Sequence, residues 1–285
     1  MKTIPTEILL QKWQHLFQGS NFEVEITADQ SPTLRMLGSP AENSSRPESM
    51  HHSGGAATET KYIYSQVLEA ALSLYLSKSH KNKKFSTAVI GLGLGYIEIC
   101  WALSLLKKKL SSSDKMTLDT FETVSKLTSL FQAWVSSPQT GQNLSLNDNE
   151  EVSIYDFVAN KIQPDVQLAD VIHILNQAFK KNDLRFHENL LNFHEATQWN
   201  VICYDAFSQK TSHPLWQKDF LDDFLTQHAA EDCVFTTYAC TGILKKALQE
   251  KGFTLLKRPG FQGKRDSTLA VRGYFSTDLS LFQTF

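Results

Sequence analysis

Short apolar runs alternate with segments of helical periodicity along the chain from residue 61 onward. The apolar runs predict strands at 85–93, 115–122, 184–191, 199–207, 233–239, 252–258 and 267–275. Helices are predicted at 61–76, 96–110, 123–135, 215–228 and 241–251. Such alternation builds a mainly parallel sheet with helices on both faces. The last two strands are joined by PGFQGKRD, which is too short for a parallel crossover, so they run antiparallel. The sequence therefore predicts an α/β, doubly wound, seven-stranded fold with an antiparallel last strand.

The first 60 residues follow a different pattern. NFEVEIT at 21–27 alternates like a strand, TLRML at 33–37 is its expected hairpin partner, and 38–60 is rich in Ser, Gly and Pro, as loops are. We expect residues 1–60 to form an irregular extension, a hairpin and a long loop, that packs on a core domain of residues 61–285. Within that domain, a polar and helical insertion is expected at about 138–182.

Composition limits the class of protein. The net charge of −2 argues against a broadly basic nucleic-acid-binding surface but leaves room for a local basic patch. The four cysteines lie among apolar residues without metal-ligand spacing, which is typical of reduced, buried thiols in a cytoplasmic protein. The apolar run 86–106 contains Glu98 and three glycines and leads into three lysines, so a strand followed by a helix is expected there rather than a membrane span. No metal site is expected.

Three glycines follow the strand at 85–93. Gly91, Gly93 and Gly95 are spaced G-x-G-x-G, and they let the backbone turn tightly and approach a ligand at the carboxyl end of the strand. A turn that only packs explains them about equally well. Glu122 ends the next strand about thirty residues later, where a carboxylate can accept hydrogen bonds from both hydroxyls of a ribose.

Two further features lie at the same predicted edge. The strand VICYDAF runs directly into Asp205, where a carboxylate can receive a substrate amine or its proton. The alternative is a helix N-cap, but the residues that follow are typical of a loop. The loop KRPGFQGKRD offers Lys257, Arg258, Lys264 and Arg265 around Phe261, a combination that suits phosphates and a stacked base.

Several motifs together resemble the methyltransferase domain of the MnmC family, whose bifunctional members act in tRNA wobble-uridine maturation. They are HHSGGAATET, Asp205-Ala206-Phe207, Pro214-Leu215-Trp216, FTTYACTGILKKALQEKGF and, most specifically, KRPGFQGKR. The resemblance touches most of the chain from about residue 50. It implies the sheet of Rossmann-like methyltransferases and S-adenosylmethionine as cofactor.

The resemblance also implies roles for individual residues. S-adenosylmethionine would be bound by Gly91, Gly93, Gly95, Glu122 and Glu59, with either Glu188 or Asn189 at the adenine. Asp205 would face the methyl-accepting amine of an aminomethyl-uridine in tRNA. The expected substrate contacts are Phe207, Pro214, Trp216, Phe261, Lys264 and Arg265. We expect a stand-alone form without the FAD-dependent oxidase domain of bifunctional members, and a separate oxidase of the same pathway as a partner.

Three hypotheses therefore remain open. The first is an N-methyltransferase acting on a wobble aminomethyl-uridine of tRNA. The second is a methyl- or aminopropyl-transferase for a small amine, which predicts an acidic pocket. The third, from another class, is a non-catalytic cofactor-binding module that serves as a protein partner. It is motivated by the turn GLGLG, where the family usually has G-F-G-T-G, and by the insertion at 138–182.

Overall fold

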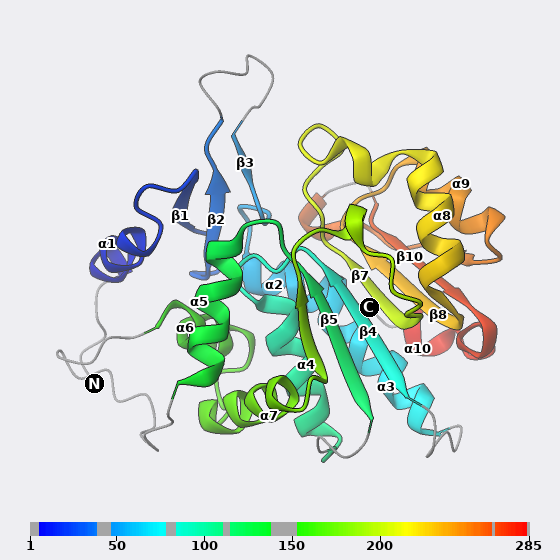
Figure 1. The fold of residues 1–285 in the computed structure, drawn as a ribbon, viewed down its shortest axis with the longest axis horizontal. Helices are drawn as coiled ribbons and strands as arrows, with labels where there is room; N and C mark the ends of the chain where they lie inside the picture. The colour runs from blue at the N-terminus through cyan, green and yellow to red at the C-terminus, as the bar shows by residue number, and fades with distance from the viewer. Residues whose placement is uncertain are drawn as a thin grey trace.

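A seven-stranded sheet forms the centre of the molecule (Figure 1). The structure is a computed structural model that describes residues 6–38, 47–77, 84–110, 115–137, 153–263 and 266–283. The strands are β4 (Phe85–Ile90), β5 (Met116–Phe121), β6 (Leu184–His187), β7 (Trp199–Tyr204), β8 (Ala229–Thr237), β9 (Thr254–Leu256) and β10 (Thr268–Arg272). Their order is β6-β5-β4-β7-β8-β10-β9. β10 runs antiparallel to both neighbours and the other neighbouring pairs are parallel, which confirms the predicted fold class.

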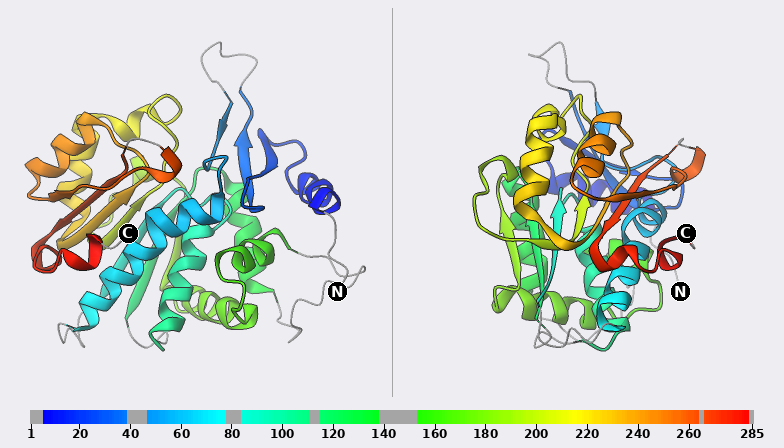
Figure 2. Two further views of the ribbon diagram at one scale, coloured as in Figure 1. Left: turned by 180° about the vertical axis from the view of Figure 1, so that it is seen from behind. Right: turned by 90° about the vertical axis from the view of Figure 1, so that its right-hand side faces the viewer.

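Helices cover both faces of this sheet (Figure 2). They are α3 (Gln66–Ser77), α4 (Tyr96–Lys107), α5 (Ser125–Ser136), α6 (Ile154–Ile162), α7 (Leu168–Lys180), α8 (Lys218–His228), α9 (Gly242–Glu250) and the short α10 (Ser280–Gln283). Successive strand residues enter different cores: Val89 and Cys203 pack with α3 to α7, whereas Ile90 and Tyr204 pack with α8 and α9. Alternation with a period of two is what a strand buried on both faces requires.

The N-terminal region is more ordered than the sequence suggests. β1 (Phe22–Ile26) and β2 (Pro32–Met36) form the predicted antiparallel hairpin, and β3 (Glu48–Ser49) adds a third strand. The expectation of an irregular extension is wrong in two places. Helix α1 (Thr6–Leu16) precedes the hairpin, and the helix expected from residue 61 already begins with α2 (Ala56–Thr60) and passes through a π-helical turn, Lys61–Ser65, into α3.

Burial explains why these elements form. Leu9 and Trp13 of α1, and Phe17 just after it, are buried in the same core as α4 and α6, and the Trp13 ring packs edge-on against Phe157 at 5.0 Å. The amide of Gln14 accepts a hydrogen bond from the backbone N–H of Val24 at 2.7 Å, which ties α1 to β1. Residues 6–38 therefore share a core with the seven-stranded sheet.

The expected insertion is helical where the structure describes it. α6 and α7 occupy most of residues 153–182, and residues 138–152 lie outside the described part. The Trp134 indole of α5 donates a 2.7 Å hydrogen bond to Asp156 of α6, so these helices pack as part of the core. Among the described residues, no helix is long and apolar enough to cross a membrane.

A buried carboxylate links three strands of the sheet. Asp119 of β5 is fully buried and accepts hydrogen bonds from Arg185 at 2.7 Å, His187 at 2.8 Å and Trp199 at 2.8 Å. Burial opposes ionisation, but these donors outweigh it and lower the pKa of Asp119 below its ordinary value. Asp119 therefore holds β5, β6 and β7 together rather than contributing to a ligand site.

We predict that Asp119→Asn lowers the free energy of unfolding by about 3 kcal/mol, because it leaves buried donors without their charged partner. The measurement is urea unfolding at neutral pH, with the exposed Asp165→Asn as control. The folded-state pKa is lowered, so the contribution is present above the unfolded-state pKa and is lost as pH falls through the folded-state pKa. Equal stability of Asp119→Asn and wild type at neutral pH would contradict this assignment.

A second buried acid lies in the first turn of α4. Glu98 is fully buried, its Oε1 accepts a 2.8 Å hydrogen bond from Thr120, and its Oε2 has no partner among the described residues. Burial raises the pKa of Glu98 to about 8. Glu98 is therefore a neutral carboxylic acid in the folded protein at neutral pH.

We expect Glu98→Gln to stabilise the protein more at about pH 8.5 than at about pH 5. Between the unfolded-state pKa, near 4.5, and the folded-state pKa, near 8, only the unfolded chain releases this proton, so wild-type stability falls as pH rises. Glutamine removes that dependence. The measurement is thermal unfolding of the wild type and Glu98→Gln at the two pH values, with the exposed Glu7→Gln as control. A difference in stability that does not change with pH would contradict the raised pKa of Glu98.

Candidate functional site

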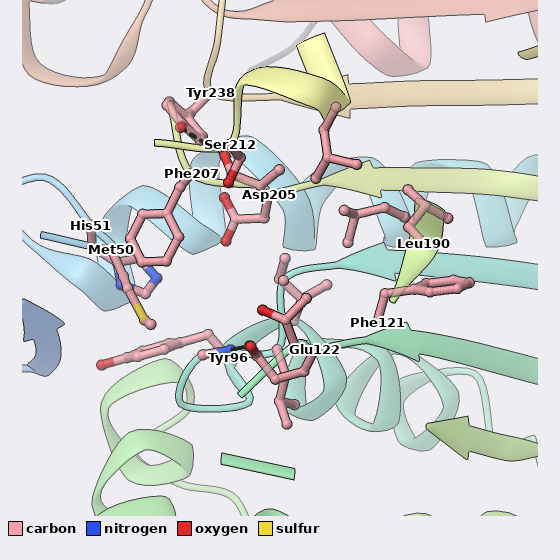
Figure 3. A pocket seen from close by; sticks show the side chains of 18 of the residues that line it. Met50, His51, Tyr96, Phe121, Glu122, Leu190, Asp205, Phe207, Ser212 and Tyr238 are labelled. Carbon is pink, nitrogen blue, oxygen red and sulfur yellow. Dashed lines mark hydrogen bonds between the residues drawn. The ribbon is translucent and has the colours of Figure 1, made fainter. Parts of the chain in front are cut away.

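A cavity lies at the carboxyl ends of β5, β4 and β7, beside the glycine turn (Figure 3). The Gly91 N–H donates to Phe121 O at 2.9 Å and the Asp205 N–H donates to Ile90 O at 2.9 Å, so the three strand ends are in register. The residues that line it are Glu48, Ser49, Met50, His51, His52, Glu59, Ile90, Gly91, Leu92, Gly93, Tyr96, Ile97, Phe121, Glu122, Thr123, Glu188, Asn189, Leu190, Asp205, Ala206, Phe207, Ser212, Leu215 and Tyr238. The strand ends predicted to meet at one edge thus border one cavity.

The three glycines of the turn have different surroundings. All have positive φ, at 105° for Gly91, 52° for Gly93 and 70° for Gly95. A Cβ on Gly91 would lie 2.6 Å from the carbonyl oxygen of Asp205, whereas one on Gly95 would collide with the ring of Phe131. Gly91 and Gly93 line the cavity, but Gly95 serves the packing of α4 against α5.

Glu122 extends from the end of β5 toward the glycine turn. Its Oε2 accepts the Gly93 N–H at 3.3 Å and its Oε1 accepts the Val124 N–H at 2.8 Å. Burial raises the pKa of the Glu122 carboxyl, although these backbone donors oppose the rise. Each carboxylate oxygen can accept more than one hydrogen bond, so the group retains capacity for a ligand hydroxyl.

Asp205 enters the cavity from the end of β7, on the other side of the turn from Glu122 (Figure 3). The buried phenol of Tyr64 donates a hydrogen bond to Asp205 Oδ1 at 2.5 Å. The hydroxyl of Tyr238 donates to the backbone carbonyl of Ala206 at 2.9 Å. Two carboxylates therefore flank the glycine turn, as the sequence predicts.

The N-terminal region supplies one wall of the cavity, of which the sequence indicated only Glu59 and the motif HHSGGAATET. Glu48 of β3 accepts hydrogen bonds from the Ser208 backbone N–H and hydroxyl, both at 3.0 Å, and from the Thr211 hydroxyl. It thereby fixes the loop after β7. The His51 ring packs edge-on against Tyr96 at 4.8 Å. Glu48 lies in a segment predicted only as a loop, and no periodicity marks it.

The three other expected cofactor residues also border the cavity. Glu59 is 5% exposed and accepts the His52 N–H at 2.6 Å, so this carboxylate anchors the N-terminal wall. Glu188 is exposed. The side chain of Asn189 caps a short 3₁₀ turn by accepting the Leu191 N–H at 2.9 Å.

The expected substrate residues separate into three groups. Phe207 lines the cavity. Pro214 and Trp216 lie outside its lining, and Trp216 is 2% exposed with its indole donating to Phe207 O at 2.7 Å, so Trp216 supports the loop instead of offering a stacking surface. Lys264 and Arg265 lie outside the described residues.

The loop after β9 also differs from expectation. Arg258 is buried rather than available to phosphate, and its guanidinium stacks over the Tyr62 ring at 4.5 Å. Phe261 does not line the cavity, but its ring lies 5.7 Å from that of His52, which does. The basic patch predicted from the sequence is thus reduced by one of its arginines, because Arg258 is turned inward.

The cavity is acidic. Its described lining holds five carboxylates and neither lysine nor arginine. The carboxylates belong to Glu48, Glu59, Glu122, Glu188 and Asp205. Such a lining favours cationic groups, and a sulfonium and an ammonium are both cationic.

These features define a class of protein, and the comparisons agree. A family model described as S-adenosyl-L-methionine-dependent methyltransferase matches residues 128–273, about half of the chain, and the chain belongs to that family. S-adenosylmethionine is its cofactor.

Relatives with similar sequences carry one particular name. The chain is 37% identical to the tRNA 5-methylaminomethyl-2-thiouridine biosynthesis bifunctional protein MnmC of Hahella chejuensis over 67 residues. These aligned residues make up 24% of this chain and 10% of that protein. The chain is 28% identical over 109 residues to the MnmC of Legionella pneumophila strain Corby, 38% of this chain and 16% of that one. The chain thus matches less than a fifth of the length of either relative.

A solved structure supports the fold. The crystal structure of MnmC2 from Aquifex aeolicus aligns with a TM-score of 0.55 at 18% identity, over 95% of this chain and 78% of that one. The predicted resemblance to the methyltransferase domain of the MnmC family is confirmed.

The residues present fit S-adenosylmethionine. Gly93 is open toward the cavity, since a Cβ there would meet only Met50 Sδ, at 3.1 Å. A backbone without side chains beside a carboxylate is the arrangement that allows a nucleoside to approach a strand end. Ile97, Phe121 and Leu190 supply apolar surface next to it.

We predict that Gly91→Ala weakens S-adenosylmethionine binding at least about tenfold, because the new Cβ displaces the Asp205 carbonyl and distorts the turn. Gly252→Ala is the matched control: its φ is also positive, at 79°, but a Cβ there meets nothing within 4 Å. Both variants carry a cost of about 1 kcal/mol for an alanine at positive φ. Calorimetric titration with S-adenosylmethionine measures the affinity of both variants. Equal affinities of Gly91→Ala and Gly252→Ala would contradict a role of the glycine turn in holding the cofactor.

Proposed function

We propose that this protein transfers the methyl group of S-adenosylmethionine to an amine nitrogen, and that the amine is the aminomethyl group of a wobble uridine in tRNA. The observation that carries the proposal is the placement of Glu122 and Asp205 on either side of one glycine turn, in an acidic cavity. Glu122 suits a ribose, and Asp205 suits an amine.

S-adenosylmethionine supplies an electrophilic methyl group on a cationic sulfur. In our proposal the backbone of Gly91 and Gly93 lies against the cofactor, and the Glu122 carboxylate accepts hydrogen bonds from the ribose hydroxyls. Glu59 contributes negative charge from the N-terminal wall, and Glu188 or Asn189 faces the adenine.

Asp205 orients the amine in this proposal. An ammonium ion has no lone pair, so it must lose a proton before its nitrogen can attack the methyl carbon. The Asp205 carboxylate can hold the ammonium by charge, accept or relay that proton and align the neutral nitrogen. Alignment of the two reactants accounts for much of the barrier reduction such a site can provide.

The names of the MnmC relatives support tRNA as the substrate. Aromatic rings at the rim of the cavity give further support. Phe261, His52 and Tyr62 lie close together, with ring centroids 5.7 Å apart for His52–Phe261 and 6.3 Å for Tyr62–Phe261. Bases extruded from RNA are commonly held by stacking on such rings. Lys257, Lys264 and Arg265 of the same loop would contact phosphate. A separate FAD-dependent oxidase would act in the same pathway, in the cytoplasm.

A second candidate is a methyl- or aminopropyl-transferase for a small amine. The cavity lining of five carboxylates without lysine or arginine favours it, since a free polyamine needs no phosphate contacts. A non-catalytic module that binds the cofactor and a protein partner would have no need for a second carboxylate facing the turn.

We expect S-adenosylmethionine to bind the wild type and Asp205→Ala with similar affinity, and Glu122→Ala at least about tenfold more weakly, because only Glu122 faces the ribose. Methyl transfer is then measured with tRNA bearing an aminomethyl-uridine and with small polyamines. Asp205→Ala is expected to lower kcat by about 100-fold or more.

The outcomes separate the hypotheses. Transfer to tRNA alone supports the proposal, and transfer to polyamines alone replaces it with the second candidate. Binding of the cofactor without transfer to either leaves the non-catalytic module. If the wild type does not bind S-adenosylmethionine, both enzymatic hypotheses are wrong.

A further inference from the structure

The carboxylate of Asp205 is held by a residue from a distant helical segment. Tyr64 is 2% exposed, and its hydroxyl donates to Asp205 Oδ1 at 2.5 Å. Tyr238, from the end of β8, holds the next peptide group through the Ala206 carbonyl. One tyrosine therefore fixes the side chain at the end of β7, and another fixes the backbone.

Tyr64 lies in the π-helical turn between α2 and α3. A π-turn widens the helix locally and redirects the side chains that follow, and such turns are frequent at functional sites. The turn is itself supported. The Ile63 carbonyl accepts hydrogen bonds from Thr236 Oγ1 at 2.6 Å and from the Arg258 guanidinium at 3.1 Å. The buried arginine of the KRPGF motif thus stabilises the turn that presents Tyr64.

The chemical state of this phenol determines what it can do. Burial and the neighbouring Asp205 charge raise the pKa of Tyr64 well above its ordinary value. The phenol therefore keeps its proton and acts only as a donor. A hydrogen bond from a neutral phenol to a carboxylate stabilises the ionised form and fixes one of its two oxygens.

We propose that Tyr64 is a positioning residue for Asp205: its hydrogen bond fixes the rotamer of the carboxylate so that it faces the amine. The inference rests on the proposed function, in which Asp205 holds the methyl-accepting nitrogen. Tyr64 itself does not contact the cavity in our assignment, since it is absent from the lining. Its effect on catalysis therefore passes through Asp205.

The test is a double-mutant cycle of Tyr64→Phe and Asp205→Ala, read in two ways. In kinetics, Tyr64→Phe is expected to lower kcat about tenfold, with the affinity for S-adenosylmethionine changed less than about twofold, and to cause no further loss in the Asp205→Ala background. Tyr204→Phe is the matched control, because its buried phenol donates at 2.6 Å to a backbone carbonyl, that of Leu215. The proposal would be overturned if Tyr64→Phe lowered kcat by the same factor in the wild type and in Asp205→Ala.

The second readout does not depend on any substrate. Thermal unfolding is expected to show Tyr64→Phe lowering the Tm of the wild type by about 3 °C but not lowering that of Asp205→Ala, where the phenol has already lost this acceptor. Coupling in Tm without methyl transfer by the wild type would mean that the proposed function fails while the Tyr64–Asp205 contact stands. Absence of coupling in both readouts, with an active wild type, would refute the role of Tyr64 alone.

Discussion

The close approach of β4 and β7 at the glycine turn determines the geometry of the site. The space between Gly91 and the Asp205 carbonyl leaves no room for a side chain, and hydrogen bonds across the strand ends keep β5, β4 and β7 in register. Glu122 and Asp205 each follow the end of a strand next to β4, so this register places them on opposite sides of one turn. A shift of one residue along β5 or β7 would turn the carboxylate that follows that strand to the other face of the sheet.

The N-terminal region forms the part of the cavity wall that the sheet does not supply. Glu48 ties β3 to the loop after β7, and Glu59 and His51 form the adjoining wall. If the carboxyl ends of the strands were open to water, the carboxylates would attract a cationic ligand only weakly, because bulk water screens their charge. Covering these strand ends with β3 and the helical segment 56–77 excludes water and so strengthens the attraction between each carboxylate and a cationic ligand. The N-terminal segment, for which the sequence indicated only Glu59 and its motif, is therefore a larger part of the site than expected.

Sequence periodicity predicts the site residues at strand ends but not the orientation of side chains in loops. Glu122 and Asp205 were found because apolar runs fix where a parallel strand ends, and all such ends share one edge. The family resemblance implied a substrate contact for Trp216, and the basic loop KRPGFQGKRD suggested that Arg258 is available to phosphate. The structure buries both, Trp216 under the loop after β7 and Arg258 against Tyr62. The orientation of a loop side chain depends on neighbours distant in sequence, which periodicity does not encode.

By itself, the sequence determined the α/β class, the antiparallel last strand, the position of the glycine turn and the two carboxylates beside it. Local periodicity and turn chemistry carry that information. Only the tertiary structure decided that Gly95 packs against Phe131, that α1 joins the core, and that Tyr64 reaches Asp205 across 141 positions of the chain. Each of these depends on how separately formed elements pack against one another, and packing is a property of the whole fold rather than of any single segment.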